Sequence, residues 1–188
     1  MAIVVVGGGA RGAGKTALVC GLIAALPEFS WIAVKITGHM HGDGTAVREE
    51  SVAEQGTDTG RYLAAGARRA FLVSALDAEL GERLCELETL AGPKAHFVFE
   101  SNRVLGLLRA DLGLAIEPEA GTPTKPSFAL IERDRHASVR RAGAGDEEKF
   151  LAGAQPEFLL RDFARIPGWM QEWLRERLNS AGARQLRR

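Results

Sequence analysis

The sequence predicts an α/β fold: a mostly parallel sheet flanked by helices, with a helical extension at its C-terminal end. Short apolar runs rich in β-branched residues alternate with helical patterns up to residue 116, as in parallel βαβ units. The 188 residues, 46% of them hydrophobic, are enough to form a core without disulfides or a structural metal. We therefore expect one nucleotide-binding domain over residues 1–188, with a βα core over 1–116 and an extension over 117–188.

The expected elements of the core follow in chain order. Buried strands are predicted at 2–6, 31–36, 70–73, 96–99 and 112–116, because each is a short apolar run bounded by polar residues or glycine. Helices are predicted between them at 15–26, 60–67, 77–90 and 104–109, from apolar residues at helical spacing and from capping residues. Residues 37–57, rich in Gly, Thr, His and acids, are expected to form a long loop.

The pattern is less regular beyond residue 116. Three prolines between residues 117 and 127 predict a loop, and residues 137–139 a weak edge strand. Residues 146–178 are interpreted as helical, with breaks near Pro156 and Pro167. Trp169 and Trp173 lie four residues apart, a spacing more typical of a core or dimer face than of a cofactor site.

Charge and composition exclude some classes of function. Lys plus Arg and Asp plus Glu number 24 each, so the chain has no basic surplus for bulk nucleic-acid binding. No apolar run reaches the roughly 18 residues that span a bilayer, and we expect no membrane partner. The two cysteines, Cys20 and Cys85, form no metal or redox motif. We expect a reduced, cytoplasmic protein.

The segment from Gly9 to Thr16 matches the Walker A pattern GxxxxGK[ST] at every fixed position. Its glycines let backbone N–H groups turn toward phosphate oxygens, the lysine reaches the β- and γ-phosphates, and the threonine hydroxyl binds Mg²⁺. The following helix adds its positive N-terminal end. This motif makes the predicted fold a P-loop NTPase type; a dinucleotide GxGxxG reading would leave the lysine and threonine unexplained. The expected nucleotide-binding residues here are Gly9, Arg11, Gly12, Ala13, Gly14, Lys15, Thr16 and Ala17.

Polar residues at strand ends are the remaining candidates. Glu100 ends the fourth predicted strand, where a P-loop enzyme needs an acid for Mg²⁺ or its water; a capping or solvated loop acid is the alternative. Asp58 is a second acid for the same role, or a simple helix N-cap. We therefore assign catalysis to Lys15, Glu100 and Asp58, and the metal to Thr16, Glu100 and Asp58. Lys35, at the end of the second strand, is expected to meet phosphate or an anionic ligand such as a pterin, unless it is an ordinary surface lysine.

Two histidines and an acid are spaced for a shared face in the loop after Lys35. His39, His41 and Asp43 stand at i, i+2 and i+4, so an extended backbone would point them the same way. Such a face suits a metal or an acidic substrate. Without a further fixed ligand, a permanent metal site is the weaker interpretation.

Several segments together resemble the molybdopterin-guanine dinucleotide biosynthesis protein B (MobB) family. They are the Walker A segment, Lys-Ile-Thr-Gly-His-Met-His at 35–41, Asp-Thr-Gly-Arg-Tyr-Leu-Ala-Ala-Gly-Ala at 58–67, and Glu-Ser-Asn at 100–102. The resemblance covers residues 2–116. It implies binding of GTP, in preference to ATP, with Mg²⁺, slow hydrolysis, a homodimer, and an accessory role beside a molybdenum-cofactor enzyme that attaches GMP. No Asn/Thr-Lys-x-Asp motif for guanine occurs, and Lys125 is a candidate for the base pocket.

Two other functions fit the same residues. In a small-molecule kinase, Lys35, His39, His41 and Arg61 would bind the acceptor and Asp58 would be the base. In a nucleotide-regulated adaptor without catalysis, the long loop and the C-terminal helices would dock another enzyme, with the two tryptophans 169 and 173 as exposed anchors.

Overall fold

A computed structural model describes residues 1–39 and 45–185. The described strands form one sheet in the order β3-β4-β2-β5-β1-β6-β7-β9-β8. The strands are β1 Ile3–Gly8, β2 Ile32–Thr37, β3 Val47–Glu49, β4 Arg69–Ser74, β5 Phe97–Glu100, β6 Leu112–Ile116, β7 Ala137–Arg141, β8 Lys149–Leu151 and β9 Glu157–Leu160. The α-helices are α1 Lys15–Ala25, α2 Asp58–Ala64, α3 Leu80–Ala91, α4 Phe128–Asp134 and α5 Gly168–Gln185, with short 3-10 turns at Pro27–Phe29 and Arg103–Gly106.

The sheet is parallel except at its two edges, where β3 pairs antiparallel with β4 and β8 antiparallel with β9. β1 lies between β5 and β6, and its register aligns Val6 with Glu100 on one side and with Leu114 on the other. β2 lies on the other side of β5 and aligns Lys35 with Glu100. Because the carboxyl ends of parallel strands share one edge, the residues after β1, β2, β5 and β6 come together there.

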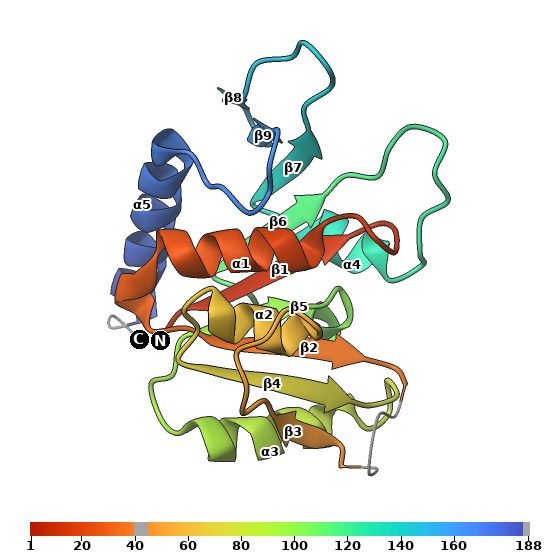
Figure 1. Cartoon of the computed structure of the whole chain (residues 1–188), viewed down its shortest axis with the longest axis vertical. Helices are drawn as coiled ribbons and strands as arrows, with labels where there is room; N and C mark the ends of the chain where they lie inside the picture. The colour runs from red at the N-terminus through yellow and green to blue at the C-terminus, as the bar shows by residue number, and fades with distance from the viewer. Residues whose placement is uncertain (40–44, 186–188) are drawn as a thin grey trace.

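Helices cover both faces of the sheet (Figure 1). On one face, α1, α2 and α5 bury Leu18, Tyr62 and Leu174 in a single apolar cluster. On the other, α3 and α4 bury Leu84 and Ile131 in a second cluster. The strands of the central sheet contribute to both, because successive side chains of a strand point to opposite faces. The fold class predicted from the sequence is therefore confirmed.

The interpretation of residues 146–178 as helical is wrong for residues 146–167, about two thirds of the range. Residues 149–151 form β8 and residues 157–160 form β9, and a helix begins only at Gly168. Phe158, Leu159 and Leu160 are all buried, because β9 lies between β7 and β8 and has neighbours on both sides. Tertiary pairing thus outweighs the helix-like composition of Glu147 to Leu151.

Three smaller expectations also change. The long loop at 37–57 contains β3, an edge strand. The helix expected at 104–109 is a 3-10 turn over Arg103–Gly106. Residues 128–134, to which no element was assigned, form α4. Each is a short element whose place is determined by its neighbours rather than by its own periodicity.

The two C-terminal tryptophans pack on the sheet. The Trp173 ring lies edge-on to Phe158 at 5.1 Å between centroids, and Trp169 stacks on the same ring at 5.9 Å. Trp169 keeps 37% of its surface exposed. These contacts give both indoles a packing role at the β9 end of the sheet.

The helix α1 approaches the chain before α5 closely. A Cβ added to Gly21 would lie 2.5 Å from the backbone oxygen of Phe163. Only glycine permits this contact, because a methyl group there would overlap an immobile carbonyl. The contact helps to fix the C-terminal segment against the helix that follows the glycine-rich loop.

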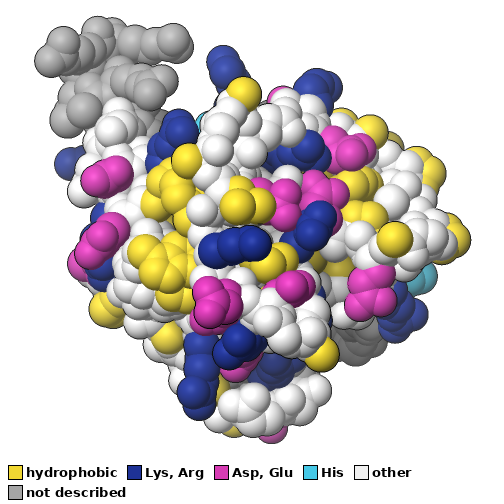
Figure 2. Space-filling model, turned by 90° about the horizontal axis from the view of Figure 1, so that it is seen from above, with side chains coloured by type: hydrophobic (Ala, Val, Ile, Leu, Met, Phe, Trp, Pro, Cys, Tyr) yellow, Lys and Arg dark blue, Asp and Glu magenta, His cyan; other side chains and the backbone are white. Residues whose placement is uncertain are grey.

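The surface seen from above, at the β8–β9 end, mixes charges of both signs (Figure 2). Lys and Arg side chains lie interspersed with Asp, Glu and apolar side chains. Among the helices of the described ranges, none combines the length and apolar character needed to cross a bilayer.

Candidate functional site

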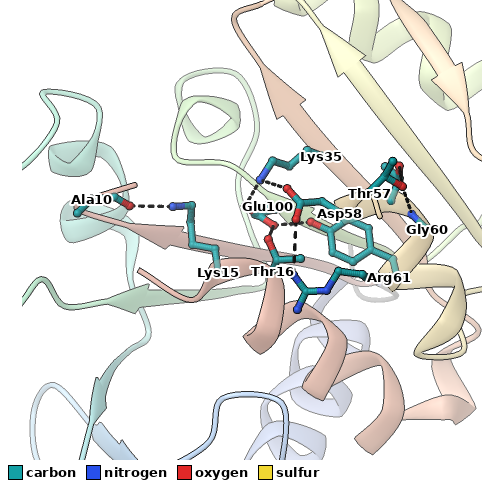
Figure 3. A network of polar contacts seen from close by, with 11 residues as sticks. Ala10, Lys15, Thr16, Lys35, Thr57, Asp58, Gly60, Arg61 and Glu100 are labelled. Atoms are coloured by element: carbon teal, nitrogen blue, oxygen red, sulfur yellow. Dashed lines mark hydrogen bonds and ion pairs between the residues drawn. The ribbon is translucent and has the colours of Figure 1, made fainter. Parts of the chain in front are cut away.

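The glycine-rich loop connects β1 to α1 at the carboxyl edge of the sheet. Gly12 and Gly14 have φ values of 76° and 93°, which non-glycine residues rarely adopt. The Lys15 side chain folds back over the loop, and its Nζ donates to the Ala10 carbonyl at 3.1 Å (Figure 3). The loop therefore has the curled backbone and the returning lysine that phosphate binding requires.

The start of this loop is held by a residue from the neighbouring strand end. The Asn102 side chain accepts from the Gly8 N–H at 2.9 Å and donates to the Gly8 carbonyl at 3.2 Å. It is buried, and it also donates to Ser127. Asn102 thus clamps the end of β1 and so orients the loop.

Glu100 is the centre of a buried polar network beside the loop. Its side chain is 2% exposed. The carboxylate accepts from the Thr16 hydroxyl at 2.8 Å, from the Tyr62 hydroxyl, and from the Lys35 ammonium. A buried carboxylate needs such partners, because an unpaired charge there is strongly destabilising. Glu100 is therefore neither a solvated loop acid nor a helix cap.

Lys35 bridges Glu100 to Asp58. Its Nζ lies 2.9 Å from Asp58 Oδ2 (Figure 3). Burial by itself would lower the pKa of Lys35, but the Glu100 charge and the hydrogen bonds to both acids outweigh it and raise that pKa. Burial would likewise raise the pKa of Asp58, but the hydrogen bond and charge of Lys35 lower it. Both groups are thus charged at neutral pH, and Lys35 is part of the site rather than of the open surface.

Asp58 is free for the site because another residue caps its helix. Thr57 is the N-cap of α2, and its Oγ1 accepts from the Gly60 N–H at 2.9 Å. The Asp58 carboxylate instead faces Lys35 and, at 3.8 Å, Arg61. The N-cap alternative for Asp58 is therefore wrong, and the adjacent threonine has that role.

Lys15 lies among charges of both signs. Burial is the main reason its pKa is lowered; the charges of Glu100 and Asp58 oppose this effect, and those of Lys35 and Lys125 add to it. An anion bound among these ammonium groups would relieve both the burial cost and the repulsion. The backbone of Lys125 is fixed beside the loop, since its N–H donates to the Gly9 carbonyl at 3.0 Å.

A cavity of about 710 Å³ joins these groups. Most of the residues that the sequence pointed to line it: Arg11, Gly12, Ala13, Gly14, Lys15, Thr16, Ala17, Lys35, His39, Asp58, Arg61, Glu100 and Lys125. Gly9 is set back, with Pro118 and Thr124 side chains 3.3 Å and 3.2 Å from where its Cβ would be. His41 and Asp43 fall outside the described residues. Within ranges 1–39 and 45–185, no three His, Cys, Asp or Glu side chains gather as a metal site would require.

Two polar residues of the site went unrecognised in the sequence. Tyr62 is fully buried; burial and the neighbouring Glu100 charge raise the pKa of its hydroxyl well above the ordinary value, so it stays a donor. Asn102 holds the loop as described above. The available signal was that Tyr62 is the only tyrosine of the chain and stands one turn after Asp58, where a helix repeats its face.

The donor set suits a hard divalent cation such as Mg²⁺. The Thr16 hydroxyl gives its proton to Glu100, so its lone pairs point away from that acid and are available to a metal. Glu100 and Asp58 add carboxylate oxygens, the ligands that Mg²⁺ prefers. The Lys35 ammonium lies against the same two acids and shares their charge with any metal.

The fold is similar to that of a solved structure. LpxK from Aquifex aeolicus, crystallised in complex with ATP, superposes with a TM-score of 0.51 and 16% sequence identity, over 84% of this chain and 53% of that one. The chain has a P-loop NTPase fold. It spans about half the length of LpxK. No protein-family model matches the sequence, and no curated protein matches it either.

Proposed function

We propose that this protein binds a nucleoside triphosphate with Mg²⁺ and hydrolyses it slowly. The observation that supports this most strongly is the convergence of Lys15, Thr16 and Glu100 on one cavity at the carboxyl edge of the sheet. Lys15 and the loop N–H groups would hold the phosphates, and Thr16 would hold the metal, with Glu100 and Asp58 at its other side. Bound Mg²⁺ would neutralise charge on the β- and γ-phosphates.

The order of motifs supports a MobB-like role as the finer proposal. The Lys35 segment, the Asp58 helix and Glu100-Ser101-Asn102 follow the Walker A segment in the family's order, and the three meet at one site. In this role the protein would bind GTP in the cytoplasm, act as a homodimer, and assist an enzyme that attaches GMP to the molybdenum cofactor.

A phosphoryl-transfer function is the second candidate, favoured by an exposed acid in the cavity. Asp58 keeps 39% of its side chain exposed, and Arg61, His39 and Arg103 line the same cavity. A hydroxyl acceptor bound in this cavity would have a carboxylate available to take its proton. The LpxK crystal contains ATP, in keeping with either candidate.

Calorimetric titration of GTP and ATP with Mg²⁺ tests the proposal. Lys15→Ala is expected to weaken binding by at least about tenfold, because it removes charge-assisted bonds to phosphate. Lys149→Ala, on the exposed strand β8, is the matched control and should bind like wild type. Absence of binding to wild type, or equal binding by both variants, would refute the proposal.

The fate of the γ-phosphate separates the two candidates. A slow hydrolase releases phosphate to water at a rate that added small-molecule acceptors leave unchanged. A kinase transfers labelled γ-phosphate to one of them, and Asp58→Asn then abolishes the transfer while nucleotide affinity persists. Thin-layer separation of labelled products distinguishes these outcomes directly.

A further inference from the structure

A second cavity, of about 890 Å³, lies beside the glycine-rich loop on the side away from Lys35. It is bounded by the loop after β6, the end of β7 and the start of β9, and it shares Arg11, Gly12 and Ala13 with the phosphate cavity. The two cavities therefore adjoin each other at the loop. The volume of the second cavity is that of an ordinary small-molecule site.

We propose that this second cavity holds the nucleoside, and that Glu117 makes it select guanine over adenine. The inference rests on the proposed function, since it places the remaining part of the same ligand. Lys125, the residue that the sequence suggested for base contact, lines the phosphate cavity instead. The walls of the second cavity thus supply the contacts that the absent Asn/Thr-Lys-x-Asp motif would have supplied.

One wall offers a flat surface beside the loop. The Arg141 guanidinium lies over the Phe163 ring, 4.6 Å from its centroid, and both residues line the cavity. Arg141 Nη1 donates to the Arg161 carbonyl at 3.1 Å, which helps to fix it. The Phe163 ring is itself buried, 2% exposed, so the guanidinium is the plane that can stack on a nucleobase. This wall is accordingly suited to the face of a purine.

Another part of the lining carries a fixed acceptor. Glu117 follows directly after β6, and its Oε1 accepts from the Ser138 hydroxyl at 2.7 Å and from Arg135 Nη1 at 3.2 Å. Arg135 is held in turn by Gln155 at 2.6 Å. In the part of the chain that the structure describes, both donors to Glu117 use Oε1, which leaves Oε2 for a ligand. The carboxylate is 23% exposed, so a hydrogen bond to it is only partly screened by water.

The chemistry of the base edges then gives the selectivity. Guanine presents two adjacent donors, N1–H and the 2-amino group, which a carboxylate accepts. Adenine presents a lone pair at N1, which would face the carboxylate unpaired and repelled. Hypoxanthine keeps N1–H without the 2-amino group and should rank between them. Xanthine has N1–H and a carbonyl at C2, so its edge needs one acceptor and one donor from the protein. The side-chain amide of a glutamine at position 117 would provide both.

Competition titrations with Mg²⁺ and four nucleotides test the assignment, with inorganic tripolyphosphate as the reference that has no base. Wild type should bind GTP, ITP and ATP in descending order, and GTP more tightly than tripolyphosphate. Glu117→Gln should lose roughly tenfold or more in GTP affinity and gain affinity for XTP. Glu82→Gln, on α3 and 73% exposed, is the matched control and should keep the wild-type ranking.

A second variant covers the case in which Glu117→Gln fails to fold. Ala120→Trp, on an exposed loop position of the cavity wall, should weaken every nucleotide while tripolyphosphate binds as before. Equal affinity of wild type for tripolyphosphate and all nucleotides, or a preference for ATP, would overturn the nucleoside assignment and leave phosphate binding intact. Failure of tripolyphosphate and nucleotides alike would instead overturn the proposed function itself.

Discussion

Removing the Tyr62 hydroxyl is the sharpest test of the buried network. Tyr62→Phe keeps the ring in its place on α2 and deletes one oxygen atom. That hydroxyl donates to Glu100 Oε2, which otherwise accepts only from Thr16 among the described residues. Tyr62 is 0% exposed and Glu100 is 3% exposed, so water cannot readily replace the lost donor. The variant therefore isolates one hydrogen bond to a buried carboxylate.

The expected cost follows from that geometry. A hydrogen bond to a charged group contributes about 1.5–3 kcal/mol, and the deleted oxygen leaves too small a space to add a cavity cost. We expect Tyr62→Phe to lower the free energy of unfolding by about 2 kcal/mol. For a chain of this length that corresponds to a fall in Tm of roughly 4–8 °C. Because the raised pKa of Tyr62 keeps the hydroxyl protonated, the loss should be the same between pH 6 and 8.

Urea unfolding followed by tryptophan fluorescence measures this loss. Thr89→Val is the matched control. The Thr89 hydroxyl donates to the Cys85 carbonyl at 2.9 Å on an exposed helix face. Because water can replace this bond, the loss in the free energy of unfolding should stay below about 0.5 kcal/mol. If Tyr62→Phe also costs less than about 0.5 kcal/mol, the carboxylate is satisfied without the phenol and the argument for a tightly held Glu100 fails.

Two further stability predictions follow from the same structure. Burial alone would raise the pKa of Asp58, but Lys35 lowers it. The ionised carboxylate therefore stabilises the fold above the unfolded pKa of about 3.9. This stabilisation is lost as the pH falls through the folded pKa. Asp58→Asn should therefore lower the free energy of unfolding by up to about 1 kcal/mol at pH 7, a small value because solvent screens a partly exposed ion pair. At pH 2.5 the variant and the wild type should be equally stable. A difference in urea midpoint between variant and wild type that is the same at both pH values would contradict this. Gly21→Ala should cost about 1–3 kcal/mol by overlap with Phe163, whereas Gly81→Ala on α3, with open space around its Cβ, should gain up to about 1 kcal/mol. Thermal unfolding compares the two glycine variants, and similar shifts in both would refute the packing argument.

The core of the fold was predictable because its strands are apolar runs with clear boundaries and its helices carry apolar residues at helical spacing. The runs at 2–6, 31–36 and 112–116 lie within one or two residues of β1, β2 and β6. β3 and β8 have three residues each, too few to show a period, and both exist by antiparallel pairing with a neighbour. β9 was missed for a related reason: its burial depends on β7 and β8, which the local sequence does not reveal.

The site was predictable where chemistry is tied to a fixed motif. Lys15 and Thr16 belong to the Walker A pattern, and Glu100 was found because it ends a buried strand that we expected to be parallel. Their convergence on one cavity is observed. Tyr62 and Asn102 could not be found in this way, since their roles depend on contacts 38 and 94 residues distant in the chain. Sequence spacing carries no record of such contacts.

The position of β1 explains why one loop can serve two different cavities. β5 and β6 flank β1, and each ends in or runs directly into a glutamate, Glu100 on one side and Glu117 on the other. Glu100 has both oxygens engaged by donors and is buried with a lysine, an environment suited to fixing charge near phosphates and a metal. Among the residues that the structure describes, Glu117 has donors on one oxygen only, an environment suited to recognising a donor on a ligand. If both proposals hold, neutralising each acid in turn should separate their effects. Glu100→Gln would change the Mg²⁺ dependence of binding equally for every nucleotide. Glu117→Gln would change the order of affinities for the bases and leave the Mg²⁺ dependence as it is in wild type.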